Sequence, residues 1–191
     1  MNKNIPNILT ILRVIAVPFF VLAYYKEQYI AAFIIFVIAS LTDMLDGRIA
    51  RKYNLVSNFG KFMDPLADKI LTYSAFCLFA EYGIIPGYFL IIVLFREFAV
   101  AGIRMLAAEK GVVIAADIFG KLKTLLQMIS IPLYLLAFAL PQTGRIPAGK
   151  EGIGYIIASV AYYLMVASIV MTVISGCNYI FKNIGVLKDD N

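Results

Sequence analysis

Long stretches without a charged residue are the feature that most constrains how this chain can fold. Two of them, Thr124–Gly144 and Gly152–Phe181, exceed the roughly 18 apolar residues that predict a membrane-spanning helix. The chain of 191 residues is 62% hydrophobic and 15% charged, with a mean hydropathy of +0.85. Soluble domains are about half apolar and about a quarter charged. The sequence therefore predicts an integral membrane protein.

Four shorter charge-free runs extend this prediction to six transmembrane helices. These runs reach spanning length only if each helix carries its charged residues at one end. Breaks rich in glycine, proline or polar residues separate them, so we expect helices near residues 6–25, 28–51, 60–81, 86–108, 117–139 and 153–181. A chain of this length has room for one domain, so residues 1–191 are predicted to form a single all-α, polytopic membrane domain.

The distribution of basic residues predicts the orientation of these helices. Six spans place both termini on the same side of the membrane. Of the 17 lysines and arginines, all but Lys26, Arg145, Lys150 and the helix-embedded Arg96 fall on the side of the termini. The positive-inside rule therefore predicts cytoplasmic termini, in the plasma or inner membrane of the cell.

Four aspartates stand at the cytoplasmic ends of two neighbouring predicted helices. Asp43 and Asp46 are three residues apart on the second helix, and Asp64 and Asp68 are four residues apart on the third. Each pair therefore lies on one stripe of its helix. A tight turn makes the two helices antiparallel neighbours, so we expect the four carboxylates to converge at the cytoplasmic margin of the membrane.

Such a cluster predicts a metal site. Two ionised carboxylates about 4 Å apart repel by roughly 4 kcal/mol at an effective dielectric near 20, and a divalent cation offsets that repulsion. The chain has no histidine, and oxygen ligands alone suit Mg²⁺ or Mn²⁺. Four carboxylates could hold two ions, an arrangement that clamps a phosphoryl group during displacement. Gly47, Ala50 and Gly60 leave space beside them for a substrate.

The spacing of these residues resembles the signature of the CDP-alcohol phosphatidyltransferase family, D-x2-D-G-x2-A-R-x8-G-x3-D-x3-D. Every signature position is filled, by Asp43, Asp46, Gly47, Ala50, Arg51, Gly60, Asp64 and Asp68. The resemblance implies that a hydroxyl attacks the β-phosphorus of a CDP-linked lipid and releases CMP, with Mg²⁺ or Mn²⁺ held by the four aspartates. It further implies that Asp68 deprotonates the hydroxyl and that Gly47, Ala50, Arg51 and Gly60 bind the CDP-lipid. A solvated loop would explain one aspartate taken alone, but not the full spacing.

Three further segments, Pro6–Arg13, Arg96–Arg104 and Gly120–Gln127, resemble the phosphatidylglycerophosphate synthase branch of this family. The resemblance implies CDP-diacylglycerol and glycerol 3-phosphate as substrates. Arg104, Lys121 and Lys123 add cations on the side of the aspartates and are candidates for binding the phosphate of the acceptor. Ordinary positive-inside topology, with contact to anionic lipid, explains these cations equally well.

Several alternatives stay open at this point. The acceptor could instead be inositol phosphate, serine or a second lipid. A cation transporter would also use acidic residues, although transporters place them near the midplane of the membrane. Arg96 and Glu97 lie deep in the fourth predicted helix, either as a paired structural set or as residues that position Arg104. The family resemblance also implies a homodimer.

Overall fold

The computed structural model describes residues 5–52, 58–115, 117–140 and 152–187. Its helices are α1 (Ile5–Tyr25), α2 (Tyr29–Lys52), α3 (Asn58–Glu81), α4 (Gly87–Glu109), α5 (Ile118–Ala139) and α6 (Ile153–Lys182), followed by the short 3-10 helix η1 (Ile184–Leu187). The six predicted helices are confirmed, each boundary to within two residues. Because the described residues contain no strand, the all-α prediction is also confirmed for that part of the chain.

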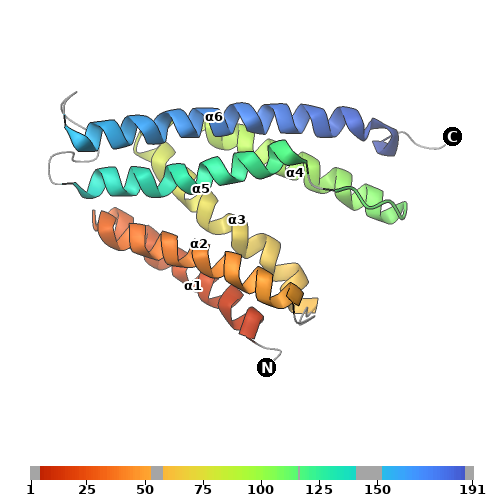
Figure 1. Cartoon of the computed structure of the whole chain (residues 1–191), viewed down its shortest axis with the longest axis horizontal. Helices are drawn as coiled ribbons and strands as arrows, with labels where there is room; N and C mark the ends of the chain where they lie inside the picture. Colours follow the sequence, from red (N-terminus) through yellow and green to blue (C-terminus); the bar gives the residue numbers. More distant parts are fainter. Residues whose placement is uncertain (1–4, 53–57, 116, 141–151, 188–191) are drawn as a thin grey trace.

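The helices form two groups, which are joined by α3 and by the packing of α2 against α5 (Figure 1). The first group is α1 and α2, which pack side by side, and the second is the long antiparallel pair α5 and α6. Helix α3 packs against α1, crosses behind α5 and leads to α4, which lies along α6. Consecutive helices run in opposite directions, so the start of α1, the end of α2 and the start of α3 lie at one end of the bundle (Figure 1).

Glycine ends two of the helices by taking a backbone conformation that other residues rarely adopt. Gly83, with a φ of 68°, follows α3, and Gly111, with a φ of 74°, follows α4. The amide of Val112 closes the end of α4 by donating to the carbonyl oxygen of Ala107 at 2.8 Å. Glycine therefore fixes the sharp ends of α3 and α4 that the sequence predicts.

The core is strongest at the end of the bundle away from the signature residues. Phe79 of α3 is fully buried, and its ring lies 5.1 Å from the ring of Tyr134, 6.1 Å from Tyr24 and 6.2 Å from Phe138. These rings join α1, α3 and α5 in one cluster of edge-on and tilted contacts, the geometry that aromatic pairs prefer. The cluster holds the helices together where no charged signature residue lies.

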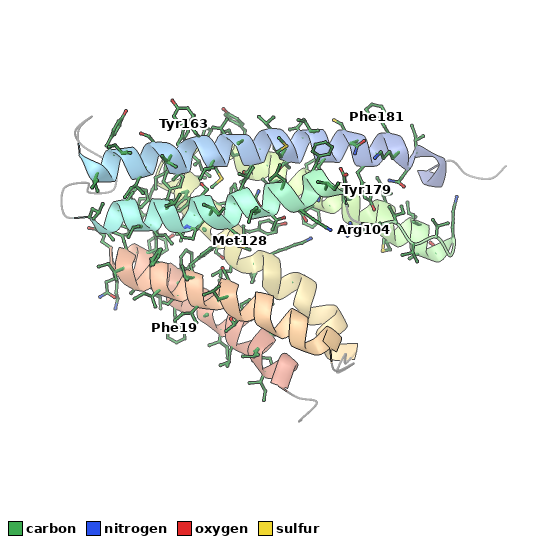
Figure 2. All side chains as sticks on the ribbon, viewed as in Figure 1. Phe19, Arg104, Met128, Tyr163, Tyr179 and Phe181 are labelled. Carbon is green, nitrogen blue, oxygen red and sulfur yellow. The ribbon has the colours of Figure 1, made fainter. Side chains whose placement is uncertain are left out.

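Three helices are long and apolar enough to cross a membrane, over Ile8–Tyr25, Ile118–Ala139 and Ile153–Lys182; this holds for the described residues. In α2 the described apolar segment is shorter, Tyr29–Thr42. Large apolar side chains such as Phe19, Tyr163 and Phe181 are exposed and project from the bundle (Figure 2). An outward apolar surface of this extent is typical of a protein that lies against lipid.

Candidate active site

The signature positions lie at one junction of the fold. The last turns of α2 hold Asp43, Asp46, Gly47, Ala50 and Arg51, and the first turns of α3 hold Gly60, Asp64 and Asp68. The two helices contact each other, and the end of α2 lies beside the start of α3 (Figure 1). The side chains of these eight residues lie outside the described set, so the convergence of the carboxylates stays a prediction.

Helix α1 adds two buried polar side chains at the same end of the bundle. Thr10 and Arg13 are almost fully buried, and α1 packs against α2 and α3, the two helices that carry the signature. Their spacing of three residues puts them on one face of α1. The sequence indicates no site role for either residue beyond the resemblance of Pro6–Arg13, although a polar pair at helical spacing in an apolar run is the signal that marks an inward face.

A charge cluster built from Lys69, Arg96, Glu97 and Lys123 joins α3, α4 and α5; we call it the Glu97 cluster. The Oε2 atom of Glu97 lies 2.7 Å from the Nζ atom of Lys69, and its Oε1 atom accepts hydrogen bonds from Lys123 and, at 3.2 Å, from Nη1 of Arg96. The side chain of Lys69 is 38% exposed and that of Lys123 only 5%. A carboxylate this enclosed is tolerated because cations surround it.

The arginine of this cluster fits between two glycines. Its Nη2 atom donates to the Oγ of Ser175 at 2.7 Å. A Cβ atom added to Gly120 on α5 would lie 2.9 Å from Nη2 of Arg96, and one added to Gly176 on α6 would lie 3.1 Å from its Cγ. The ion pair of Arg96 with Glu97 and this close fit between helices agree with a paired structural set, one of the two interpretations that the sequence allows.

Replacing Gly120 with alanine tests this fit. The new methyl group would displace the guanidinium from Ser175, at a cost of about 1–3 kcal/mol in the free energy of unfolding. We therefore expect a lower apparent Tm in detergent. Gly102→Ala is the matched control, because a Cβ at Gly102 of α4 meets nothing within 4 Å. An equal or higher Tm in Gly120→Ala than in this control would contradict the fit.

The structure places the three predicted phosphate-binding cations in three different environments. Arg104 donates from Nε to the hydroxyl of Tyr179 at 3.0 Å, and its Cζ atom lies 5.5 Å from the centre of the Tyr179 ring (Figure 2). Lys121 is exposed, whereas Lys123 is buried in the Glu97 cluster. Two residues correspond to about 200° around a helix, which explains why the two lysines face opposite ways. The described contacts do not join the three cations, and their phosphate binding stays a prediction.

The last turns of α6 are tied to both neighbouring helices. Besides the contact between Tyr179 and Arg104 of α4, the Nδ2 atom of Asn178 donates to the Oδ2 atom of Asp117 at 3.0 Å. Asp117 occupies the N-cap position of α5. These hydrogen bonds fix the ends of α4, α5 and α6 relative to one another, and nothing in the periodicity of a single helix indicated them.

The donor chemistry of the signature fits a hard divalent cation. Among the residues whose side chains the structure describes, no group of three or more histidine, cysteine, aspartate or glutamate residues could hold a metal ion. The four signature aspartates lie outside that set, on the two adjoining helix ends described above. Four carboxylates, with no nitrogen or sulfur donor, match the ligand preference of Mg²⁺ and Mn²⁺.

Comparison with known proteins gives a consistent result along almost the whole chain. A sequence model of the CDP-alcohol phosphatidyltransferase family matches residues 3–175. The CDP-diacylglycerol–glycerol-3-phosphate 3-phosphatidyltransferase of Bacillus subtilis is 36% identical over 203 aligned positions, which cover 98% of this chain and 99% of the relative. The protein of the same name from Rickettsia felis is 35% identical over 94% of both chains. A probable phosphatidylglycerophosphate synthase of Mycobacterium tuberculosis is 36% identical over 94% of this chain and 81% of its own length.

Proposed function

Because this chain belongs to the CDP-alcohol phosphatidyltransferase family, we propose that it transfers the phosphatidyl group of CDP-diacylglycerol to glycerol 3-phosphate. The products are phosphatidylglycerophosphate and CMP. The observation that carries this proposal is the identity of 35–36%, over nearly the full length of the chain, to relatives that bear the name of this reaction. Positions that fill the whole family signature, on two adjoining helix ends, support it further.

In the proposed reaction, an oxygen of the glycerol 3-phosphate hydroxyl forms a bond to the β-phosphorus of CDP-diacylglycerol. The bond between the β-phosphorus and the bridging oxygen breaks, and CMP leaves with that oxygen and the bonding electrons. Asp68 takes the proton of the attacking hydroxyl, since a chain without histidine has carboxylates as its candidate bases near neutral pH. Gly47, Ala50, Arg51 and Gly60 bind the CDP-lipid beside it.

We propose that the reaction depends on Mg²⁺ or Mn²⁺, with two ions held by Asp43, Asp46, Asp64 and Asp68. When bound, such cations supply positive charge that offsets the repulsion among the carboxylates and the pyrophosphate oxygens. The aspartates come in pairs from two helices, so each helix end contributes half of the donor set. The placement of α2 relative to α3 therefore controls whether the four carboxylates act together.

We further propose six membrane spans with both termini and the active site on the cytoplasmic side. Within the part of the chain that the structure describes, three helices have the length and composition of spans, and consecutive helices alternate in direction (Figure 1). In α4 the residues Arg96, Glu97 and Arg104 interrupt the apolar sequence, but Arg96 and Glu97 are paired inside the bundle. Such pairing is how ionised side chains are accommodated within a membrane-spanning helix. The family resemblance also leads us to propose a homodimer.

Replacing Arg104 with alanine should weaken recognition of the acceptor. Loss of a charged hydrogen bond to phosphate raises the KM for glycerol 3-phosphate by about tenfold or more, and we expect little change in the KM for CDP-diacylglycerol. Initial rates of CMP release at varied concentrations of each substrate measure both constants. Lys26→Ala, in the exposed turn at the opposite end of the bundle, is the control. The reverse pattern would assign Arg104 to the CDP-lipid.

The direct test of the proposed function is CMP release by the purified protein in detergent. CDP-diacylglycerol and Mg²⁺ or Mn²⁺ would be offered with glycerol 3-phosphate, inositol phosphate or serine in parallel reactions. We expect CMP with glycerol 3-phosphate alone. Release with another acceptor would keep the chemistry and overturn the assigned acceptor. No release with any acceptor would contradict the proposal and favour a cation transporter.

A further inference from the structure

The Glu97 cluster reaches the signature through one residue. Lys69, whose Nζ lies 2.7 Å from Oε2 of Glu97, directly follows Asp68 on α3. The other carboxylate oxygen of Glu97 is bound by Lys123 of α5 and Arg96 of α4. Glu97 thus connects the stretch of α3 that carries Asp64 and Asp68 to two helices that carry none of the signature.

The lysines of the cluster have different surroundings, which separates their roles. Lys123 is buried and Arg96 is nearly so, and these two cations already surround the enclosed end of Glu97. The side chain of Lys69 is 38% exposed, and ion pairs with such exposure contribute little to global stability. The contact between Lys69 and Glu97 is therefore not needed to keep Glu97 inside the bundle. We therefore expect this ion pair to affect the local orientation of α3.

The position of Lys69 on α3 determines what this contact controls. Adjacent residues are about 100° apart around a helix, so position 69 lies about 100° from position 68 and about 140° from position 64, on a different face of α3. Ala67 and Leu71, each two residues from Lys69 and therefore about 200° away around the helix, are buried against the rest of the bundle. An ion pair from Lys69 to α4 opposes rotation of α3 about its own axis. Such a rotation would change the direction in which positions 64 and 68 face.

We propose that Glu97 is a positioning residue, which fixes the rotation of the start of α3 through its ion pair with Lys69 and so directs Asp64 and Asp68 toward α2. This inference rests on the proposed function, in which those aspartates hold a divalent cation. It assigns Glu97 and Lys69 no contact with substrate.

A purely electrostatic role for Lys69 predicts the opposite result. A lysine close to a cation site repels the bound cation. If Lys69 acted by its charge alone, it would therefore weaken metal binding in the wild type. Its replacement by methionine would then tighten the binding of Mn²⁺. If Lys69 instead positions α3, its replacement weakens the binding of Mn²⁺, because the carboxylates lose their shared orientation when the ion pair is broken.

The experiment measures Mn²⁺ affinity of the purified full-length protein in detergent, from the electron paramagnetic resonance signal of free Mn²⁺. We expect Lys69→Met to raise the Kd by about tenfold, the effect typical of losing a group that orients metal ligands. Lys69→Arg, which keeps the charge and the reach to Glu97, should restore the wild-type Kd. Lys182→Met, on the exposed last turn of α6, removes an equal charge elsewhere and should leave the Kd unchanged.

Further readouts separate positioning from a loss of fold. Lys69→Met should keep the wild-type Tm and the KM for CDP-diacylglycerol while kcat falls, because Glu97 retains Arg96 and Lys123. Glu97→Gln should also weaken Mn²⁺ binding, and Lys69→Met keeps the inference testable if that variant does not fold. An unchanged or lower Kd in Lys69→Met would overturn the inference, even if the wild type releases CMP with glycerol 3-phosphate as proposed. A wild type that binds no Mn²⁺ would overturn it as well.

Discussion

Replacing Asp68 with asparagine is expected to lower kcat for CMP release by about 10²–10⁴-fold, the range that a positioned general base contributes. Asparagine keeps the size of the side chain and one oxygen that can bind a cation, but it cannot accept the proton of the glycerol 3-phosphate hydroxyl. The KM for CDP-diacylglycerol and the Kd for Mn²⁺ should therefore change far less than kcat. Steady-state rates and Mn²⁺ titration of the same preparation measure all three quantities.

A matched control for this variant is Asp117→Asn. Asp117 is an aspartate at the N-cap of α5 that accepts a hydrogen bond from Asn178, and it has no part in the proposed reaction. The same chemical change there should leave kcat near the wild-type value. A near-normal kcat in Asp68→Asn would remove Asp68 from the role of base and leave its role as a metal ligand to be tested separately.

Replacing Asp64 with alanine is expected to abolish metal-dependent turnover. Alanine removes a carboxylate donor altogether, so Mn²⁺ affinity should fall by more than about 100-fold, the upper end of the effect of losing an outer-shell partner. Asp43→Ala, on the other helix, should have the same effect, because the donor set is divided between α2 and α3.

The outcome that would contradict this prediction is unchanged activity with unchanged Mn²⁺ affinity in either variant. The four aspartates would then be ordinary charged residues at the ends of two helices. A loss of activity with normal Mn²⁺ affinity would instead place the altered aspartate on the substrate. Measuring affinity and rate together therefore separates a metal ligand from a substrate contact.

The six helices could be predicted from the sequence because the residues that determine where each helix begins and ends lie within the helix or next to it. Apolar runs give the interiors of the helices, and Gly83 and Gly111 mark ends where the backbone takes a positive φ. The spacing of the four signature aspartates, three and four residues within two consecutive helices, places them on α2 and α3, where the structure has these positions; the convergence of their carboxylates stays a prediction.

The Glu97 cluster could be predicted only in part, because its members come from distant points of the chain. A structural pairing of the neighbours Arg96 and Glu97 is one of the two interpretations that the sequence allows, and the structure shows their ion pair. The ion pairs of Lys69 and Lys123 with Glu97 depend on how α3 and α5 are placed relative to α4, and no periodicity within one helix shows that placement. From the sequence, Lys123 is either a candidate phosphate ligand or an ordinary positive-inside residue, and the structure adds an ion pair with Glu97.

The contact of Arg96 with two glycines could not be predicted from the sequence for the same reason. Gly120 and Gly176 lie on different helices and allow the arginine side chain to pass between them. In the sequence, each is a single glycine inside an apolar helix, where glycine is often tolerated without a specific contact. The close approach becomes visible only when α4, α5 and α6 are in place.

The measurement that tests the proposed reaction most directly follows the phosphorus of the acceptor. Purified protein in detergent would receive CDP-diacylglycerol, Mg²⁺ or Mn²⁺, and glycerol 3-phosphate labelled with ³²P, and the mixture would then be extracted into organic solvent. We predict that the label moves into the lipid phase in a one-to-one ratio to the CMP released, and that Asp68→Asn stops both. Label that stays in the aqueous phase while CMP is released would contradict the transfer of the phosphatidyl group to glycerol 3-phosphate.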